Sequence, residues 1–209
     1  MGPVTARLFV AVWPDDAAHV ALADTVERAR LAAPEVRWQP PERWHITLAF
    51  LGPADPGRAA ARISTAERPG GTPAAEPIRL HGAGAFGPVV WAGVEHGAWL
   101  ADLARGLQQT LRVADRRFRA HVTVGRLRGE GGAARAREVV ALLASHVGPP
   151  WTPGELTLVE SVTGPTPKYH ILERWPLSPP SPGRADAQSN RDTAAGAVPH
   201  SGVPTLEEP

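Results

Sequence analysis

The chain has 209 residues, a formal net charge of +1 and no cysteine, which suits one domain with a sizeable core and excludes disulfides and thiolate metal sites. The near-neutral charge permits contact with RNA but is far from that of a protein held on nucleic acid by charge alone. No run of about 20 apolar residues could span a membrane, and the start is unlike a secretory signal, so we expect a cytoplasmic protein.

The predicted elements of the first half begin with a strand at 8–13, which is rich in β-branched and aromatic residues. A Pro-Asp-Asp segment then starts a helix on an alanine-rich stretch, with apolar residues through 20–31. A second strand follows at 45–52. A short helix at 58–67 lies between turns rich in proline and glycine.

The second half repeats the order of strand, helix and strand. A strand is predicted at 89–94, a helix with leucines at three- and four-residue spacing at 100–111, and a further strand at 121–128. The other predicted elements are strands at 78–80, 155–160 and 169–175, a helix at 135–145, and a glycine-rich loop at 81–88. Because that loop lacks the Walker pattern, we do not expect it to bind a nucleotide.

The two halves share a His-x-Thr motif within an apolar alternation, at His45 with Thr47 and at His121 with Thr123. Residues two apart on a strand lie on the same face, so each motif presents an imidazole beside a hydroxyl while its apolar neighbours face the core. A structural reading remains open for each residue, since histidines can be held by carbonyls and threonine favours strands anyway. The repeated context favours catalysis.

The order of strand, helix and histidine strand occurs twice, which predicts a duplication. We expect an α+β fold with two pseudo-symmetric lobes, each an antiparallel sheet backed by helices, and an active-site cleft between the lobes. The domain is predicted over residues 1–177. Residues 178–209 are rich in Pro, Ser, Gly and Ala and nearly lack large apolar side chains, which predicts a disordered tail.

The chain resembles the 2H phosphoesterase superfamily, and within it the bacterial RNA 2',3'-cyclic phosphodiesterases, once described as 2'-5' RNA ligases. The resemblance covers roughly residues 7–177. It rests on the segments 7–12, 36–38, 45–52, 90–94, 118–126, 160–161 and 169–172. One departure is Ala120, where family members usually have a proline; this removes a rigid entry into the strand but no catalytic group.

Two imidazoles in opposite protonation states could deprotonate water and protonate a departing ribose oxygen near neutral pH. The residues alone do not say which histidine does which. The resemblance implies that His45 is the proton donor and His121 the proton acceptor, with Thr47, Thr123 and Arg126 on the phosphate. Tyr169 is a candidate contact for a base or ribose.

The favoured function is hydrolysis of RNA 2',3'-cyclic phosphate ends to 2'-phosphates, with reversible 2'-5' ligation, by a monomer that needs no cofactor and no metal. The expected partner is RNA with such ends, tRNA fragments included, and no membrane. Two alternatives stay open: a cyclic phosphodiesterase acting on a small nucleotide or on ADP-ribose cyclic phosphate, and a non-catalytic module that binds RNA ends. Trp38 and Phe50 are interpreted as core residues rather than platforms for bases.

Overall fold

A computed structural model describes residues 5–65, 75–114, 118–162, 164 and 168–177. The predicted tail of residues 178–209 lies outside the described residues. The predicted domain of residues 1–177 is described apart from the gaps between these ranges. Within these ranges, no helix is long and apolar enough to cross a membrane.

The described residues form one eight-stranded sheet in which all neighbouring strands are antiparallel. The strands are β1 (Ala6–Val12), β2 (Arg37–Trp38), β3 (Ile46–Ala54), β4 (Arg79–Phe86), β5 (Val89–Glu95), β6 (His121–Arg126), β7 (Glu155–Val162) and β8 (Lys168–Pro176). Their order is β4-β5-β6-β3-β1-β7-β8, and β2 pairs with β6. With the helices below, the predicted α+β class with antiparallel pairing is confirmed.

Four α-helices accompany the sheet within the described residues: α1 (Asp16–Ala32), α2 (Pro56–Thr65), α3 (Ala98–Leu111) and α4 (Gly132–Leu143). The helix α1 begins where the sequence predicts, because the Asp15 carboxylate accepts a hydrogen bond from the Ala18 backbone N–H at 2.8 Å. A short 3-10 turn (Pro41–Arg43), which the sequence analysis did not predict, leads into β3.

The sheet has two halves that meet at one registered pair of residues. Ile46 of β3 faces Val122 of β6, whereas β1 pairs with β3 and β5 pairs with β6 along most of their lengths. Strand β2 lies on the β6 side and strands β7 and β8 on the β1 side. The junction of the two halves therefore falls between the two histidine motifs.

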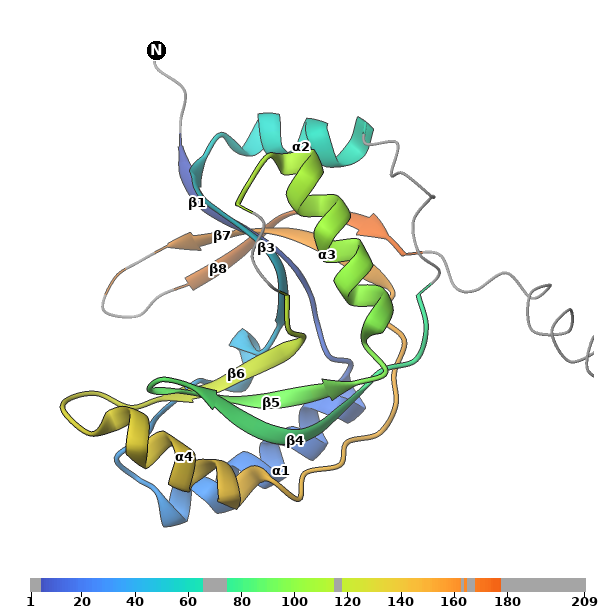
Figure 1. The fold of residues 1–209 in the computed structure, drawn as a ribbon. Coiled ribbons are helices and arrows are strands. Elements are labelled where there is room, and N and C mark those ends of the chain that lie inside the picture. The colour runs from blue at the N-terminus through green and yellow to red at the C-terminus, as the bar shows by residue number, and fades with distance from the viewer. Residues whose placement is uncertain (1–4, 66–74, 115–117, 163, 165–167, 178–209) are drawn as a thin grey trace, which may run out of the picture. The chain divides into compact units, whose positions relative to one another are not determined.

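The helices α1 and α3 each pack on the half of the sheet opposite to the strand that precedes them. The helix α1 leaves β1 but packs against α4 and β4, and α3 leaves β5 but packs against β3 and α2 (Figure 1). A side chain of each helix also bonds to the half on which the helix packs. Thr25 Oγ1 of α1 lies 2.9 Å from His146 Nδ1, and Gln108 Nε2 of α3 donates to the Leu48 carbonyl at 3.1 Å. This exchange of helices holds the two halves together.

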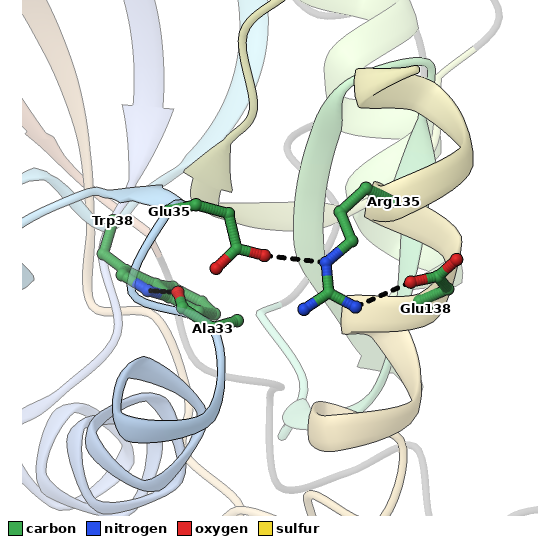
Figure 2. Close-up of polar contacts among 5 residues, drawn as sticks. All are labelled: Ala33, Glu35, Trp38, Arg135 and Glu138. Carbon is green, nitrogen blue, oxygen red and sulfur yellow. Dashed lines mark hydrogen bonds and ion pairs between the residues drawn. The ribbon is translucent and has the colours of Figure 1, made fainter.

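An exposed ion-pair network joins α4 to the segment after α1. The Arg135 guanidinium donates to Glu35 at 2.7 Å and to Glu138 at 2.6 Å (Figure 2). Beside it, Trp38 Nε1 donates to the carbonyl of Ala33 at 3.1 Å, and Trp38 packs against the core as predicted. Because exposed ion pairs contribute little, the network orients these segments more than it stabilises them.

The two faces of β1 separate the main core from the candidate site. Leu8, Val10 and Val12 are buried in the main core, while Phe9 and Ala11 belong to a second, smaller apolar cluster with Val159. Alternation along the strand explains the division, since every second side chain points to the opposite face. Trp13 and Tyr169 pack against this small cluster, and Phe9 and Tyr169 line the cavity of the candidate site.

The prediction of a glycine-rich loop at 81–88 is wrong, because most of this segment belongs to β4. Its glycines serve the strand in two ways. A register shift between Leu80 and Ala83 includes Gly82 at φ +63°, and a Cβ on Gly84 would lie 2.2 Å from the Trp91 ring. The glycine content predicted a loop, but the glycines are needed in a strand because Trp91 packs closely against the backbone at Gly84.

Candidate active site

His45 and His121 lie on either side of the pair that joins the two halves of the sheet. Ile46 faces Val122, and an antiparallel ladder extended from this pair sets each histidine opposite the other motif's threonine. His45 stands one residue before β3, and His121 is the first residue of β6. Both line one cavity of about 940 Å³, so the structure brings together the two residues that the sequence singled out.

Both imidazole rings are held in the same way. His45 Nδ1 lies 2.7 Å from the carbonyl oxygen of Arg43, and His121 Nδ1 lies 2.7 Å from the carbonyl oxygen of Arg119. Because a carbonyl can only accept, each Nδ1 carries the proton and donates it. In the neutral ring, Nε2 is then the basic nitrogen.

Three aromatic rings surround His45. The Phe9 ring stacks on the imidazole at a centroid distance of 4.7 Å, the Trp13 ring lies 5.2 Å away, and Tyr169 meets it edge-on at 5.4 Å. The Trp13 indole is itself fixed, because its Nε1 donates to Thr157 Oγ1 at 2.8 Å. His45 is thus packed into an aromatic setting on its own half of the sheet.

Two aromatic rings accompany His121. Phe86 meets the imidazole edge-on at 5.1 Å, and the Trp91 ring lies 6.0 Å away. The Arg119 guanidinium lies over the Trp91 ring at 4.4 Å from its centroid. A similar contact exists at the other motif, where the Arg43 guanidinium lies 6.0 Å from the centroid of Tyr169.

Burial lowers the pKa of both histidines, since it disfavours the charged imidazolium. Burial is the main cause of a pKa of about 4 for His45; the hydrogen bond to Arg43 opposes this lowering, and the nearby His121 adds to it. The pKa of His121 is also lowered by burial, and the charge of Arg119 acts in the same direction. Both rings therefore favour the neutral form near pH 7 before an anion binds.

Three other predicted site residues, Thr47, Arg126 and Tyr169, line the same cavity. Thr123 is not among the lining residues. The reason lies in the ladder: Thr47 faces the small Ala11, whereas Thr123 faces Trp91, whose indole occupies the same face beside it. Burial also raises the pKa of Tyr169, so its hydroxyl stays protonated.

The interpretation of Phe50 as a core residue is wrong: its side chain is 65% exposed and lines the cavity. Register shifts in the β1–β3 pair insert an extra residue, so that Ala11 faces Thr47 while Phe9 faces Phe50. Phe50 therefore shares the face of Thr47, and the inward-outward alternation is broken between them. A bulge of this kind depends on pairing with β1 and leaves no local sequence pattern.

The aromatic residues Phe9, Trp13, Phe86 and Trp91, which surround the histidines, were not predicted as site residues from the sequence. Phe9 and Trp13 were assigned to a strand without a role, and Phe86 and Trp91 to a loop and a strand. A usable signal did exist for Arg43 and Arg119, because Arg-x-His-x-Thr occurs in both motifs. The described residues contain no group of three or more His, Asp or Glu that could hold a metal ion.

Comparisons with known proteins identify the family of the chain. Residues 14–165 match the family described as the 2'-5' RNA ligase superfamily. An RNA 2',3'-cyclic phosphodiesterase of Geobacillus stearothermophilus is 30% identical over 84% of this chain, and the match spans 59% of that relative's length. One from Methanothermobacter thermautotrophicus is 30% identical over 66% of this chain and 79% of its own.

Solved structures share the fold. The structure of the protein TT0787 of Thermus thermophilus has a TM-score of 0.62 and 26% identity, covering 84% of this chain and all of that one. The apo form of Escherichia coli LigT has a TM-score of 0.64 at 22% identity, covering 83% of this chain and 98% of that one.

Proposed function

The chain belongs to the 2'-5' RNA ligase superfamily, and from this premise we propose that it hydrolyses the 2',3'-cyclic phosphate ends of RNA to 2'-phosphomonoesters. The proposed reaction uses two histidines and no metal ion. The observation that carries the proposal is that His45 and His121 line one cavity with each Nδ1 bound to a carbonyl, which directs the chemistry to Nε2.

In the proposed step, Nε2 of His121 takes a proton from water while the water oxygen forms a bond to phosphorus. The bond between phosphorus and the ribose O3' breaks, and Nε2 of His45 donates its proton to O3'. The phosphate remains on O2', and proton exchange with solvent restores both rings. This assignment of donor and acceptor follows the family resemblance, since the two rings are held alike.

The assignment requires a protonated His45, although burial lowers the pKa of this residue to about 4 before an anion binds. The phosphodiester carries one negative charge, and an anion beside the ring favours the imidazolium and raises its pKa. Substrate binding would then supply the proton donor. The donor would thus be charged only when a cyclic phosphate occupies the cavity.

The other lining residues suit the substrate. Arg126 and the Thr47 hydroxyl can donate to the non-bridging oxygens and offset charge that develops on phosphorus. The resemblance implies the same role for Thr123. The edge of Tyr169 lies against His45 and Phe9, where its ring could stack on a base or contact the ribose.

The same chemistry can also join RNA. If a ribose 5'-hydroxyl replaces water, it would form a 2'-5' bond to a second RNA with each histidine in the same role, and cleavage of that bond would exchange the two roles. We further propose that the protein acts as a monomer on RNA, tRNA fragments included. The halves that meet at Ile46 and Val122 would be the two lobes of an ancestral duplication, with the cavity between them.

The test is turnover of purified protein with EDTA present, on RNA oligonucleotides and small nucleotides that carry a 2',3'-cyclic phosphate. The expected product gains one water and carries a 2'-phosphate, which phosphorus NMR distinguishes from a 3'-phosphate. Turnover only of ADP-ribose cyclic phosphate, or binding of RNA ends without turnover, would favour the alternative functions. Loss of activity in EDTA, with recovery on adding a divalent metal, would contradict the two-histidine mechanism.

A further inference from the structure

A second cavity, of about 440 Å³, adjoins the catalytic one. Its wall comes from β4, β5, the start of α3 and residues 118–120, and it shares Phe118 and Arg119 with the catalytic cavity. The volume falls within the range of about 300–1,000 Å³ that is usual for ligand pockets. The mechanism above gives this space no role.

Arg119 is the charged residue at the boundary between the two cavities. Its backbone carbonyl accepts the Nδ1–H of His121, and its guanidinium lies 4.4 Å from the centroid of the Trp91 ring. The stack on Trp91 fixes a side chain that is otherwise exposed. A cation held at this place can contact a phosphate that passes from one cavity to the other.

The second cavity suits a planar polar group rather than a second phosphate. The Trp91 ring is buried beneath the Arg119 guanidinium, so the planar groups available to a base are the partly exposed Phe118 ring and the guanidinium itself. Small residues such as Gly93 and Ala101 leave the space open. The Glu95 carboxylate, which forms an ion pair with Arg79 at 3.0 Å between Oε2 and Nε, adds an acceptor that would repel phosphate but can bind the N–H groups of a base. Stacking and hydrogen bonding of this kind are how proteins bind unpaired RNA bases.

The polarity of RNA decides which nucleotide could enter. A 2',3'-cyclic phosphate occupies the 3' end, so the chain can leave the catalytic cavity only through the 5' oxygen of the terminal ribose. We propose that the second cavity binds the nucleotide immediately 5' of the cyclic-phosphate nucleotide, with Arg119 contacting the phosphodiester between them. This inference rests on the proposed function and makes the protein selective for RNA over cyclic mononucleotides.

The experiment compares kcat/KM for adenosine 2',3'-cyclic phosphate with that for the dinucleotide ApA ending in the same group. We expect the wild-type protein to favour the dinucleotide about tenfold or more, because the mononucleotide lacks both the stacked base and the phosphodiester that Arg119 would contact. Ala101→Phe, which fills the second cavity from α3, should bring the ratio close to one. Gln109→Phe adds the same side chain at an exposed position of α3 outside both cavities and should keep the preference.

The outcomes separate the two proposals. Equal kcat/KM for both substrates in the wild-type protein, or an unchanged preference in Ala101→Phe, would overturn the second cavity's role and leave the proposed function intact. If the protein turned over neither the mononucleotide nor the dinucleotide, the proposed function itself would be overturned. Should circular dichroism show that Ala101→Phe does not fold, Ala98→Phe fills the same cavity from the exposed first turn of α3 and carries the same expectation.

Discussion

The two histidine motifs share one backbone plan and differ in the side chains around it. Each ring is fixed by a 2.7 Å hydrogen bond to the carbonyl two residues before it, and each of those residues is an arginine over an aromatic ring. The neighbours differ: Thr47 is paired with Ala11 of β1, whereas Thr123 is paired with Trp91 of β5. The position five residues after the histidine is Phe50 in one motif and Arg126 in the other.

These differences separate two otherwise equivalent groups. A two-histidine mechanism needs one imidazole neutral and the other charged when the substrate is bound. Packing among Phe9, Trp13 and Tyr169 gives His45 the larger lowering of its pKa. The duplicated frame therefore supplies matching geometry, while the unequal neighbours make His45 the weaker base in the free protein. Its proposed role as proton donor then depends on the negative charge of the bound phosphate.

The largest expected effect comes from removing either ring. His45→Ala and His121→Ala should each lower kcat/KM by about 100-fold or more, because general acid–base groups usually contribute at least that much. The double variant should be little worse than either single one, since donor and acceptor act as a unit. His170→Ala, at an exposed position of β8, is the matched control and should leave kcat/KM unchanged. A single variant that keeps a tenth of the wild-type rate would remove that residue from the mechanism.

The next effect tests the contrast between Arg126 and Phe50. Arg126→Ala should lower kcat/KM by about 10- to 100-fold, because a hydrogen bond to a charged group contributes about 1.5–3 kcal/mol. Arg128→Ala removes an exposed arginine outside the cavity and should have little effect. Phe50→Ala should raise KM for RNA and leave kcat unchanged. Equal losses for Arg126→Ala and Arg128→Ala would mean that general charge, rather than a phosphate contact, is at work.

Much of this comparison was readable from the sequence. The alternation around His45 and His121 predicted two strands with histidine and threonine on one face, and the leucines of 100–111 predicted α3. These patterns are local, and burial of one face enforces them. The α+β class follows from their order along the chain.

The contrast between the motifs was not readable, because it depends on pairing across the sheet. Nothing near Phe50 indicates the bulge that turns it toward the cavity, and nothing near Thr123 says that Trp91 faces it. The exchange of α1 and α3 between the halves is likewise a matter of docking, since an amphipathic helix does not specify which sheet it covers. Long-range contacts of this kind can be identified only once the fold is known.

The pKa difference can be measured directly by an NMR titration of the ring signals. In the free protein we expect His45 to titrate near pH 4, well below the usual 6.5, and added 2'-AMP should raise its pKa. Tyr169→Ala exposes the ring and should raise the free pKa by about one unit, a tenfold change in proton affinity, whereas Tyr169→Phe should not. Because the folded-state pKa is lowered, wild-type stability should fall as pH drops from 6.5 toward 4, and Tyr169→Ala should show a smaller dependence over that interval.

The smallest expected effect separates the two threonines. Thr47→Val keeps the shape of the side chain but removes its hydroxyl, and should lower kcat/KM by about 2- to 10-fold, since a neutral hydrogen bond contributes about 0.5–1.5 kcal/mol. Thr47→Ser, which keeps the hydroxyl, should stay close to wild type. Thr123→Val should cost less than Thr47→Val, because Trp91 stands where the other motif has Ala11 and Thr123 does not line the cavity. Equal losses at the two positions would mean that substrate binding moves Trp91 aside, and that the motifs are functionally symmetric once the phosphate is in place.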